Sequence, residues 1–256
     1  MGEPRLVEQN YSTVGRIQTV YFGEVAGVSE FDPNDLKDIT NMGLIFSDPG
    51  VQEFLTDAKG ATTQDNIDFA MKVDESTHVY AVRGSADGPV NPEEVGEAQG
   101  YIATWTEGAD TDLQIMIDHH LLPDNFTGKK AFGIACATRP GVPRHQMASA
   151  IRTVCQMLRA HELENSHQHS SDVLTTQEDI PITAFIEVDN LKSQRLLRRC
   201  GFEKLPGELT HETTENRRSN AWILNWANLD AIMQLRADKK LLQGRHLSSE
   251  DIGTMI

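Results

Sequence analysis

The segment ITAFIEVDNLKSQRLLRRCGF, residues 182–202, combines a strand pattern, a helix-capping residue and a helix exit in one short run. Its β-branched and aromatic residues predict a strand over 182–188. Asn190 is a favoured N-cap, because its side-chain oxygen can accept a hydrogen bond from the first turn of a helix. The apolar spacing predicts a helix over 191–200, and Gly201 suits the left-handed residue that often ends helices. The segment therefore predicts a strand and a helix joined at Asn190.

A second segment, ACATRPGVPRHQMASAI at residues 135–151, repeats this order of strand, turn and helix. The run AFGIACA, residues 131–137, is apolar with small side chains, which predicts a central strand covered on both faces. Prolines at 140 and 143 mark a turn. From Gln146 to Ala160 the apolar residues recur at helical spacing, so a packed helix follows.

The remaining elements are shorter patterns on both sides of these segments. We predict strands over 14–22, 77–84, 100–108 and 221–226, with 113–117 as a strand extension. Asp32 and Asp48 each precede a proline, which predicts two capped helices, and a third helical pattern follows Thr63. The stretch 161–181 is polar and predicts a loop. The chain therefore alternates strands and helices, which indicates an α/β (α+β) fold.

Together the two segments resemble the GCN5-related N-acetyltransferase (GNAT) superfamily, over roughly residues 14–226. Residues 135–151 occupy the place of that family's acyl-CoA pyrophosphate motif, in which a strand runs through a turn into a helix. The family's second motif is matched at expected offsets by Asn190, Ser193, Leu196, Gly201 and Phe202. The resemblance implies a mixed central sheet with helices on both faces and a splayed pair of strands that admits acyl-CoA.

The resemblance also implies where coenzyme A would bind. The helix start near Arg144 would hold the pyrophosphate, since a helix N-terminus offers free N–H groups and partial positive charge. The pantetheine arm would run along the strand that ends near Thr138, using its backbone groups. The residues implied to bind acetyl-CoA are Cys136, Ala137, Thr138, Arg144, His145, Gln146, Met147, Ala148, Ser149, Asn190, Ser193 and Arg199.

The first motif departs from the family pattern at the helix start. Pro143 stands at the Arg/Gln position, Gln146 at the first glycine and Ala148 at the second. Proline has no N–H to donate, and Gln146 carries a side chain where the family lets the backbone approach phosphate closely. Arg144 and His145 compensate through direct charge contact in this interpretation.

The acid and base of the family are missing as well. The family's usual tyrosine, which protonates the leaving thiolate, is Leu197 here, and strand 131–137 contains no carboxylate. Glu187, three residues before Asn190, is our first candidate for the base, and Glu107 is the second. Each also has the simpler interpretation of an exposed residue on a strand face.

Composition limits the classes of partner and the compartment. The chain has 23 Lys plus Arg against 38 Asp plus Glu, a formal charge of -15, which disfavours nucleic acid and anionic membrane and is compatible with a cationic substrate. The three cysteines have no paired spacing, so we expect neither disulfides nor zinc, and the histidine-rich loops predict no metal site. No run of about 18 apolar residues occurs. We expect a cytoplasmic protein.

The sequence predicts a domain over 14–227 between an N-terminal extension, 1–13, and an amphipathic tail, 228–256, that covers its own domain or joins two protomers as a homodimer. The resemblance implies transfer of an acetyl or other acyl group from acetyl-CoA to a primary amine of a small molecule or protein. The alternative is a non-catalytic acyl-CoA sensor or interaction module on the same fold, which the eroded motif and the amphipathic tail favour.

Overall fold

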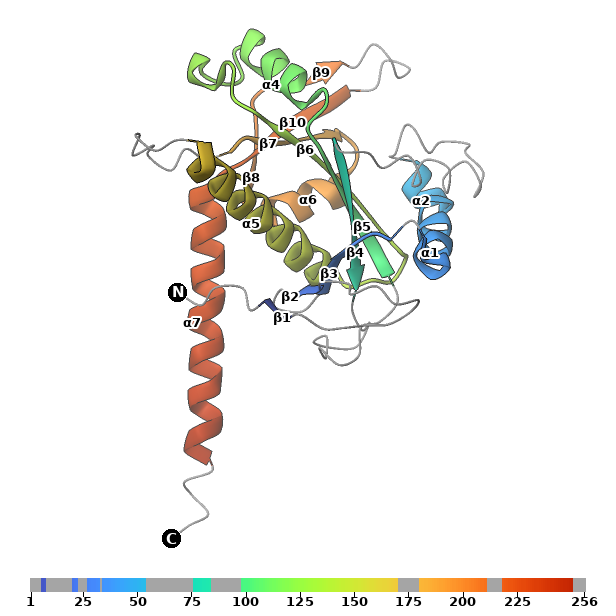
Figure 1. The fold of residues 1–256 in the computed structure, drawn as a ribbon, viewed down its shortest axis with the longest axis vertical. Coiled ribbons are helices and arrows are strands. Elements are labelled where there is room, and N and C mark those ends of the chain that lie inside the picture. The colour runs from blue at the N-terminus through green and yellow to red at the C-terminus, as the bar shows by residue number, and fades with distance from the viewer. Residues whose placement is uncertain are drawn as a thin grey trace.

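A ten-stranded sheet forms the centre of the computed structural model, which describes residues 6–7, 20–22, 27–32, 34–53, 76–83, 98–169, 180–210 and 218–250 (Figure 1). Its order is β1-β2-β3-β4-β5-β6-β7-β10-β8, and β9 pairs with β10. The strands are β1 (Leu6–Val7), β2 (Val20–Phe22), β3 (Gly27–Glu30), β4 (Thr77–Arg83), β5 (Ala98–Trp105), β6 (Phe132–Thr138), β7 (Ile182–Glu187), β8 (Phe202–Lys204), β9 (Leu209–Thr210) and β10 (Arg218–Leu224).

Helices lie against both faces of this sheet, as the family resemblance implied (Figure 1). They are α1 (Leu36–Phe46), α2 (Pro49–Gln52), α4 (Ala109–Asp118), the 3-10 turn η2 (Asp124–Phe126), α5 (Arg144–His169), α6 (Leu191–Arg199) and α7 (Trp226–Glu250). On one face α5 and α6 bury the largest apolar cluster, which includes Ile102 and Ile134. On the other face α1 packs over Tyr101, and α4 packs beside Trp105.

One pair of strands, β6 and β7, is parallel, and it separates early. Its registered pairs are Phe132 with Ile182 and Gly133 with Thr183, whereas both strands continue for several residues beyond them. On its far side β6 stays paired with β5 as far as Thr138. The splayed pair of strands that the family resemblance implied is therefore confirmed between β6 and β7.

Side-chain caps mark the start of α1 and of α2. The Asp35 side chain accepts a hydrogen bond from the Lys37 N–H and caps α1, and Asp48 caps α2 by accepting from Gly50 and Val51. The predicted cap at Asp48 is confirmed. The one at Asp32 is wrong, because its carboxylate accepts instead from the Asn34 N–H at 2.8 Å and the helix starts after Asp35.

Two predicted elements differ in type or length. Residues 113–117 form part of helix α4 and not a strand extension, because Leu113, Met116 and Ile117 share one buried helical face. The stretch predicted as a loop from 161 is helical as far as His169, so α5 is longer than expected. The structure also adds the short strands β3, β8 and β9, which carry weak sequence patterns.

Other predictions fall partly outside the described residues. Of the first predicted strand, 14–22, the structure describes β2, and the third helical pattern after Thr63 lies outside the described residues. Residues 6–7 pair with β2 at the edge of the sheet, within the stretch predicted as an N-terminal extension.

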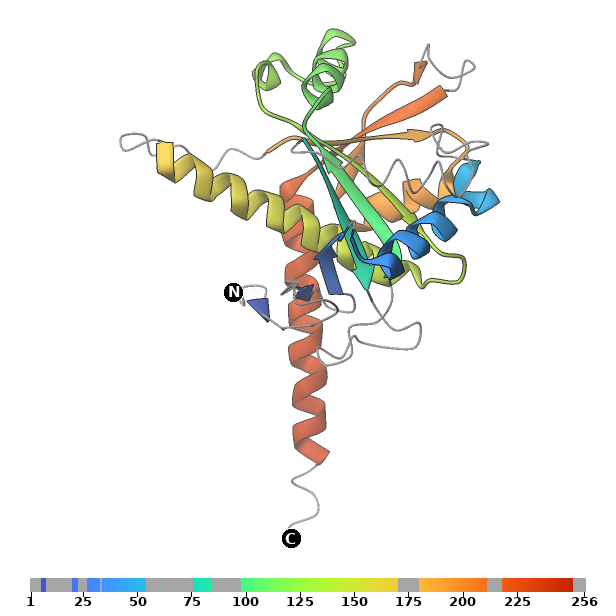
Figure 2. The same cartoon turned by 45° about the vertical axis from the view of Figure 1, so that its right-hand side comes forward.

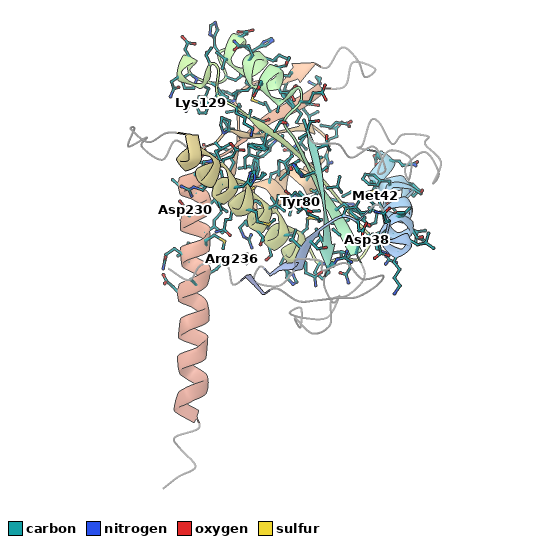
Figure 3. All side chains as sticks on the ribbon, viewed as in Figure 1. Asp38, Met42, Tyr80, Lys129, Asp230 and Arg236 are labelled. Carbon is teal, nitrogen blue, oxygen red and sulfur yellow. The ribbon has the colours of Figure 1, made fainter. Side chains whose placement is uncertain are left out.

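Helix α7 begins on the domain and then leaves it (Figures 1 and 2). Its first turns are fixed by Leu229, which is fully buried, and by Asp230, which Figure 3 labels. Asp230 pairs with Arg159 of α5 at 3.2 Å. The Arg159 guanidinium also lies 4.7 Å from the ring of Trp226. The later turns extend away from the sheet in both ribbon views. None of the helices in the described ranges is long and apolar enough to span a bilayer.

Candidate functional site

Three rows of residues cross β5, β6 and β7 on the face that carries α1 and α4, and the strand registers define them. We call the end at which β6 and β7 are still paired the closed end of the strand pair. The row there crosses paired strands, whereas the next two rows cross the gap between β6 and β7. In order from the closed end, the rows are Trp105, Gly133 and Thr183; then Ala103, Ala135 and Phe185; then Tyr101, Ala137 and Glu187.

The helices leave part of this face uncovered. Tyr101 and Ala137 are buried under α1, and Thr183 is buried at the closed end. Ala135 and Phe185 are only half-buried, although they lie on strands in the interior of the sheet. A central strand is normally covered on both faces, so these residues mark a window in the helical layer, which we call the strand window.

The backbone of β6 presents hydrogen-bonding groups toward the gap. The Phe132 N–H donates to the Pro181 carbonyl, just before β7, at 2.9 Å, and the Arg139 N–H donates to the Gln99 carbonyl of β5 at 2.9 Å. Because alternate residues of a strand point their polar groups to opposite sides, Cys136 and Thr138 face the gap. Ala137 does not, since its carbonyl oxygen lies toward Gly100 of β5.

A tight turn carries the chain from β6 into α5. The Val142 N–H donates to the Arg139 carbonyl at 3.3 Å, and Gly141 has a φ of 88°, which glycine adopts without a steric penalty. Helix α5 then begins at Arg144, with His145 exposed in its first turn. The N-terminal end of α5 therefore lies directly beyond the open end of β6.

The other predicted residues at the start of α5 are buried. Gln146, Met147, Ala148 and Ser149 are each at most 2% exposed. The Gln146 side chain is thus enclosed by the protein and does not extend into solvent over the end of the helix. The Gln146 N–H donates to the Pro143 carbonyl at 3.0 Å, and the N–H groups of the next three residues bond within the helix, so these four residues are not positioned to contact a ligand directly.

Gly100 of β5 allows α5 to approach the sheet closely. A Cβ atom at this position would lie 2.7 Å from the Met147 Cε atom and 2.8 Å from the Ala137 carbonyl oxygen. Real Cβ atoms do not approach other atoms so closely, so a side chain at residue 100 would displace the flexible end of Met147 and the backbone of β6.

The strand, cap and helix predicted around Asn190 are all present. The Asn190 Oδ1 atom accepts a hydrogen bond from the Ser193 N–H at 3.0 Å. Gln194, which sequence reasoning missed, donates from Nε2 to the carbonyls of Glu187 and Val188 at 3.2 and 2.9 Å. These bonds fix the end of β7 to the first turn of α6.

The far end of α6 packs against α5. Leu197 is 4% exposed within the main core, and the thiol of Cys200 lies 3.6 Å from the Ala148 carbonyl. Arg199 is exposed, and its backbone carbonyl accepts a hydrogen bond from the buried Arg152 at 3.2 Å. The position at which the family places its tyrosine is therefore a core position here, closed to solvent.

The two candidate bases lie at different places relative to the gap. Glu187 is half-buried and borders the strand window in the row of Tyr101. Glu107 is exposed beyond the closed end of the strand pair, where Ser76 Oγ lies 3.5 Å from its carboxylate. The structure places Glu187, and not Glu107, beside the gap.

Two further features bear on the chemistry of this region. Burial raises the pKa of the Cys136 thiol to about 12, so that thiol is protonated at neutral pH.

A separate hollow of about 160 Å³ lies between α4 and η2, lined by residues that include Leu113, Phe126 and Lys129. Across the described part of the chain, no three His, Cys, Asp or Glu residues form a group suited to a metal ion.

No family model matches the sequence, and no curated protein matches it significantly. Solved structures share its fold at low sequence identity. An acetyltransferase of the GNAT family from Bacillus anthracis is 14% identical, with 80% of this chain and 97% of that chain covered and a TM-score of 0.53. A GCN5-related N-acetyltransferase from Brucella melitensis is also 14% identical, covering 90% of this chain and 86% of that chain, with a TM-score of 0.53.

A third similar structure contains coenzyme A. It is the ribosomal L7/L12 alpha-N-protein acetyltransferase RimL in complex with coenzyme A, which is 12% identical, covers 78% of this chain and 93% of that chain and has a TM-score of 0.51. These likenesses agree with the separated strand pair, the helix start beyond it and the capped helix after β7. The chain has the fold of the GCN5-related N-acetyltransferases.

Proposed function

We propose that the protein is an N-acyltransferase that transfers an acetyl or other acyl group from a coenzyme A thioester to a primary amine. The observation that carries this proposal is the separation of β6 from β7 after Gly133 and Thr183, directly in front of the N-terminus of α5. A gap between parallel strands leaves unpaired backbone groups, and buried backbone groups require hydrogen-bonding partners.

The residues around the gap fit an acyl-CoA. The first N–H groups of α5 and its partial positive charge suit a pyrophosphate, and the exposed His145 lies in the same turn. Backbone groups of Cys136 and Thr138 point toward the gap, where a pantetheine amide could replace the missing strand. Arg199 and Ser193 of α6 border the other side as candidate contacts. An extended ligand would therefore be held mainly by the backbone.

When bound, acyl-CoA supplies an activated acyl group as a thioester. The Cys136 N–H, which points into the gap, is positioned to donate a hydrogen bond to an oxygen that becomes negative during the reaction. Glu187 borders the strand window and is the candidate to accept the proton that an attacking amine loses. Residue 197 is a buried leucine and not a tyrosine, so no side chain at this position can protonate the departing thiolate. In this mechanism, solvent supplies that proton.

Catalysis without the tyrosine is slower but not excluded. Proton transfer by a positioned side chain contributes typically about 10² to 10⁴-fold, whereas holding two reactants in the correct geometry contributes more. The strand window lets the amine approach the gap between α1 and α4. The net charge of -15 favours a cationic amine, because negative potential concentrates cations near the protein.

A second candidate function is a non-catalytic acyl-CoA sensor. The burial of Leu197 favours it, since a core residue at the usual acid position shows that the chain has not kept that catalytic group. A sensor would bind the thioester as tightly as an enzyme does but would not transfer the acyl group. Binding is thus common to both functions, and turnover separates them.

Calorimetry with acetyl-CoA tests the binding site. His145→Glu places a negative charge in the first turn of α5, which favours the helix itself but repels a pyrophosphate. We expect at least tenfold weaker binding, with stability equal to the wild type or higher by up to about 1 kcal/mol. His161→Glu is the matched control, because it makes the same exposed substitution in the same helix, about 24 Å farther along at 1.5 Å per residue. Equal affinities of the two variants for acetyl-CoA would show that the pyrophosphate does not bind at the N-terminus of α5.

Turnover tests the reaction. Purified protein is incubated with acetyl-CoA and a panel of polyamines, amino sugars and peptides, and free thiol is measured. Once a substrate is identified, we expect Glu187→Gln to lose about tenfold or more of kcat. Glu107→Gln should retain the wild-type kcat. Binding without turnover on any amine would favour the sensor.

A further inference from the structure

Trp105, at the end of β5, covers the closed end of the gap between β6 and β7. We infer that this side chain sets the length of the acyl group and restricts the donor to short chains such as acetyl. The inference rests on the proposed function, because it concerns the acyl end of the same ligand. Nothing in the sequence motifs points to this residue, which lies outside both of them.

The indole of Trp105 lies directly on the backbone of Gly133. A Cβ atom at Gly133 would be only 2.1 Å from Cε2, 2.3 Å from Nε1 and 2.5 Å from Cζ2 of the indole. Only glycine leaves room for a ring at this distance. Residue 133 is therefore glycine because the tryptophan occupies the space in which its side chain would stand.

This contact lies at the end of the gap. Gly133 and Thr183 form the last registered pair of β6 and β7, and beyond them the strands separate. Trp105 is paired with Gly133 across β5 and β6, on the face that contains the strand window. In the next row, the two residues on β5 and β6, Ala103 and Ala135, have small side chains, and Phe185 of β7 lies across the gap. On the β5 and β6 side, this row therefore leaves space up to the Trp105 indole.

The direction of the ligand follows from the position of α5. That helix begins after the open end of β6, beyond Thr138, so a pyrophosphate there places the thioester toward Gly133. The acyl group is the terminal part of the ligand and comes nearest to the closed end. Each additional carbon atom would extend it toward the Trp105 indole.

The indole is held in place from its other side. Trp105 packs against the apolar cluster of α4, which includes Ala109, Leu113 and Ile117, and against Ala131 before β6. Because it contacts both the helix and the strand, it cannot turn aside without losing packing on α4. A fixed aromatic wall of this kind discriminates by length, and one methylene in a hydrophobic pocket changes discrimination by about 10 to 200-fold.

The experiment measures dissociation constants by calorimetry for acetyl-CoA, butyryl-CoA and octanoyl-CoA. For the wild type we expect butyryl-CoA to bind about tenfold more weakly than acetyl-CoA, and octanoyl-CoA more weakly still. Trp105→Ala removes the indole that limits the length of the acyl group. The three dissociation constants should then lie within about threefold of one another. Trp105→Leu keeps apolar contact with α4 and should give an intermediate result if the alanine variant folds poorly.

His78→Ala is the control. His78 is exposed on β4 at the same end of the sheet. Its neighbour Thr77 pairs with Trp105, and successive residues of a strand point to opposite faces, so His78 lies on the face opposite Trp105. The variant should keep the wild-type order of affinities. If the wild type binds all three thioesters equally, the inference is overturned and the proposed function stands. If the wild type binds none of them, the proposed function fails first and the inference fails with it.

Discussion

The Oδ1 atom of Asn190 accepts a hydrogen bond from the backbone N–H of Ser193 at 3.0 Å, across the junction between β7 and α6. Replacing an N-cap asparagine by alanine typically costs about 0.5–2 kcal/mol. We therefore expect Asn190→Ala to lower the free energy of unfolding by about 1 kcal/mol in urea titrations. Asn190→Ser keeps an acceptor and should lie close to the wild type. Equal losses in the two variants would show that the cap contributes nothing.

The buried ion pair between Asp38 of α1 and Arg83 of β4 should be costly to break on one side. The two charged groups are 2.6 Å apart, and their side chains are 1% and 7% exposed (Figure 3 labels Asp38). Burial raises the pKa of Asp38, and the Arg83 charge opposes that rise. Arg83→Met leaves the carboxylate buried without its cation, so we expect a loss of about 3–5 kcal/mol in denaturant titrations.

A matched surface pair serves as the control for this loss. Arg218 and Glu208 are 3.0 Å apart but largely exposed, so Arg218→Met should cost about 0–1 kcal/mol. The double variant Asp38→Leu, Arg83→Met should be more stable than Arg83→Met alone, because no buried charge remains. A double variant with the summed loss of both single changes would contradict this account.

A side chain at Gly100 is expected to disturb the packing of Met147 and the pairing of β5 with β6. In Gly100→Ala the new methyl group meets Met147 and the Ala137 carbonyl at less than 3 Å. We expect a loss of about 1–3 kcal/mol in the free energy of unfolding, measured in urea, together with weaker acetyl-CoA binding by calorimetry. Adding Met147→Ala removes one of the two clashes and should restore part of the stability. If the double variant is no more stable than Gly100→Ala, the whole loss comes from the clash with the Ala137 carbonyl.

The buried thiols predict how stability changes at high pH. Burial raises the pKa of Cys200 to about 12, above the value near 8.5 of an exposed thiol. Between these values the folded protein binds the proton and the unfolded chain releases it, so stability falls as pH rises. Each such thiol contributes a slope of about 1.4 kcal/mol per pH unit.

The measurement is a series of urea titrations from pH 8 to pH 10.5 under reducing conditions. Cys200→Ala should have a shallower fall than the wild type by one thiol's slope, about 1.4 kcal/mol per pH unit. Below about pH 8.5 the two curves should run parallel, since the thiol is protonated in both states. Parallel curves over the whole range would show that Cys200 ionises in the folded protein as it does in solvent.

Truncations of α7 should separate its two halves. A chain ending after Asn228 loses Leu229, which is fully buried, and Asp230, which pairs with Arg159. We expect that truncation to cost about 2–5 kcal/mol, the range for deleting a large core side chain. A chain ending after Asp238 keeps these contacts and should melt like the full chain, because the later turns point away from the domain (Figures 1 and 2). Light scattering on the full chain and this shorter one tests whether the later turns join two protomers.

Local chemistry explains which parts of this fold were predictable from the sequence. The junction at Asn190 was predicted because a cap, a short apolar repeat and an exit glycine lie within a few residues of one another. Gly201 has the expected left-handed φ of 94°. The strands β4, β5, β6 and β7 were predicted for the same reason, since their patterns are complete within each strand.

Short apolar runs were harder to interpret. Residues 113–117 match a strand nearly as well as a helix, and packing of Leu113 and Ile117 against Ala131 decides for the helix. The cap at Asp35 was missed because Asp32, three residues earlier, offers the same chemistry. Where two local solutions have similar free energies, the contacts with the rest of the protein choose between them.

The sequence by itself determined the separate strands and helices, the capped junction at Asn190 and the absence of a tyrosine at position 197, since each depends on neighbouring residues. Only the tertiary structure decided where β6 and β7 part, that Glu187 and not Glu107 borders the gap, and that Trp105 lies on Gly133. Those features depend on the register between strands far apart in the chain. Register is fixed by burial across the whole sheet, and no local pattern contains that information.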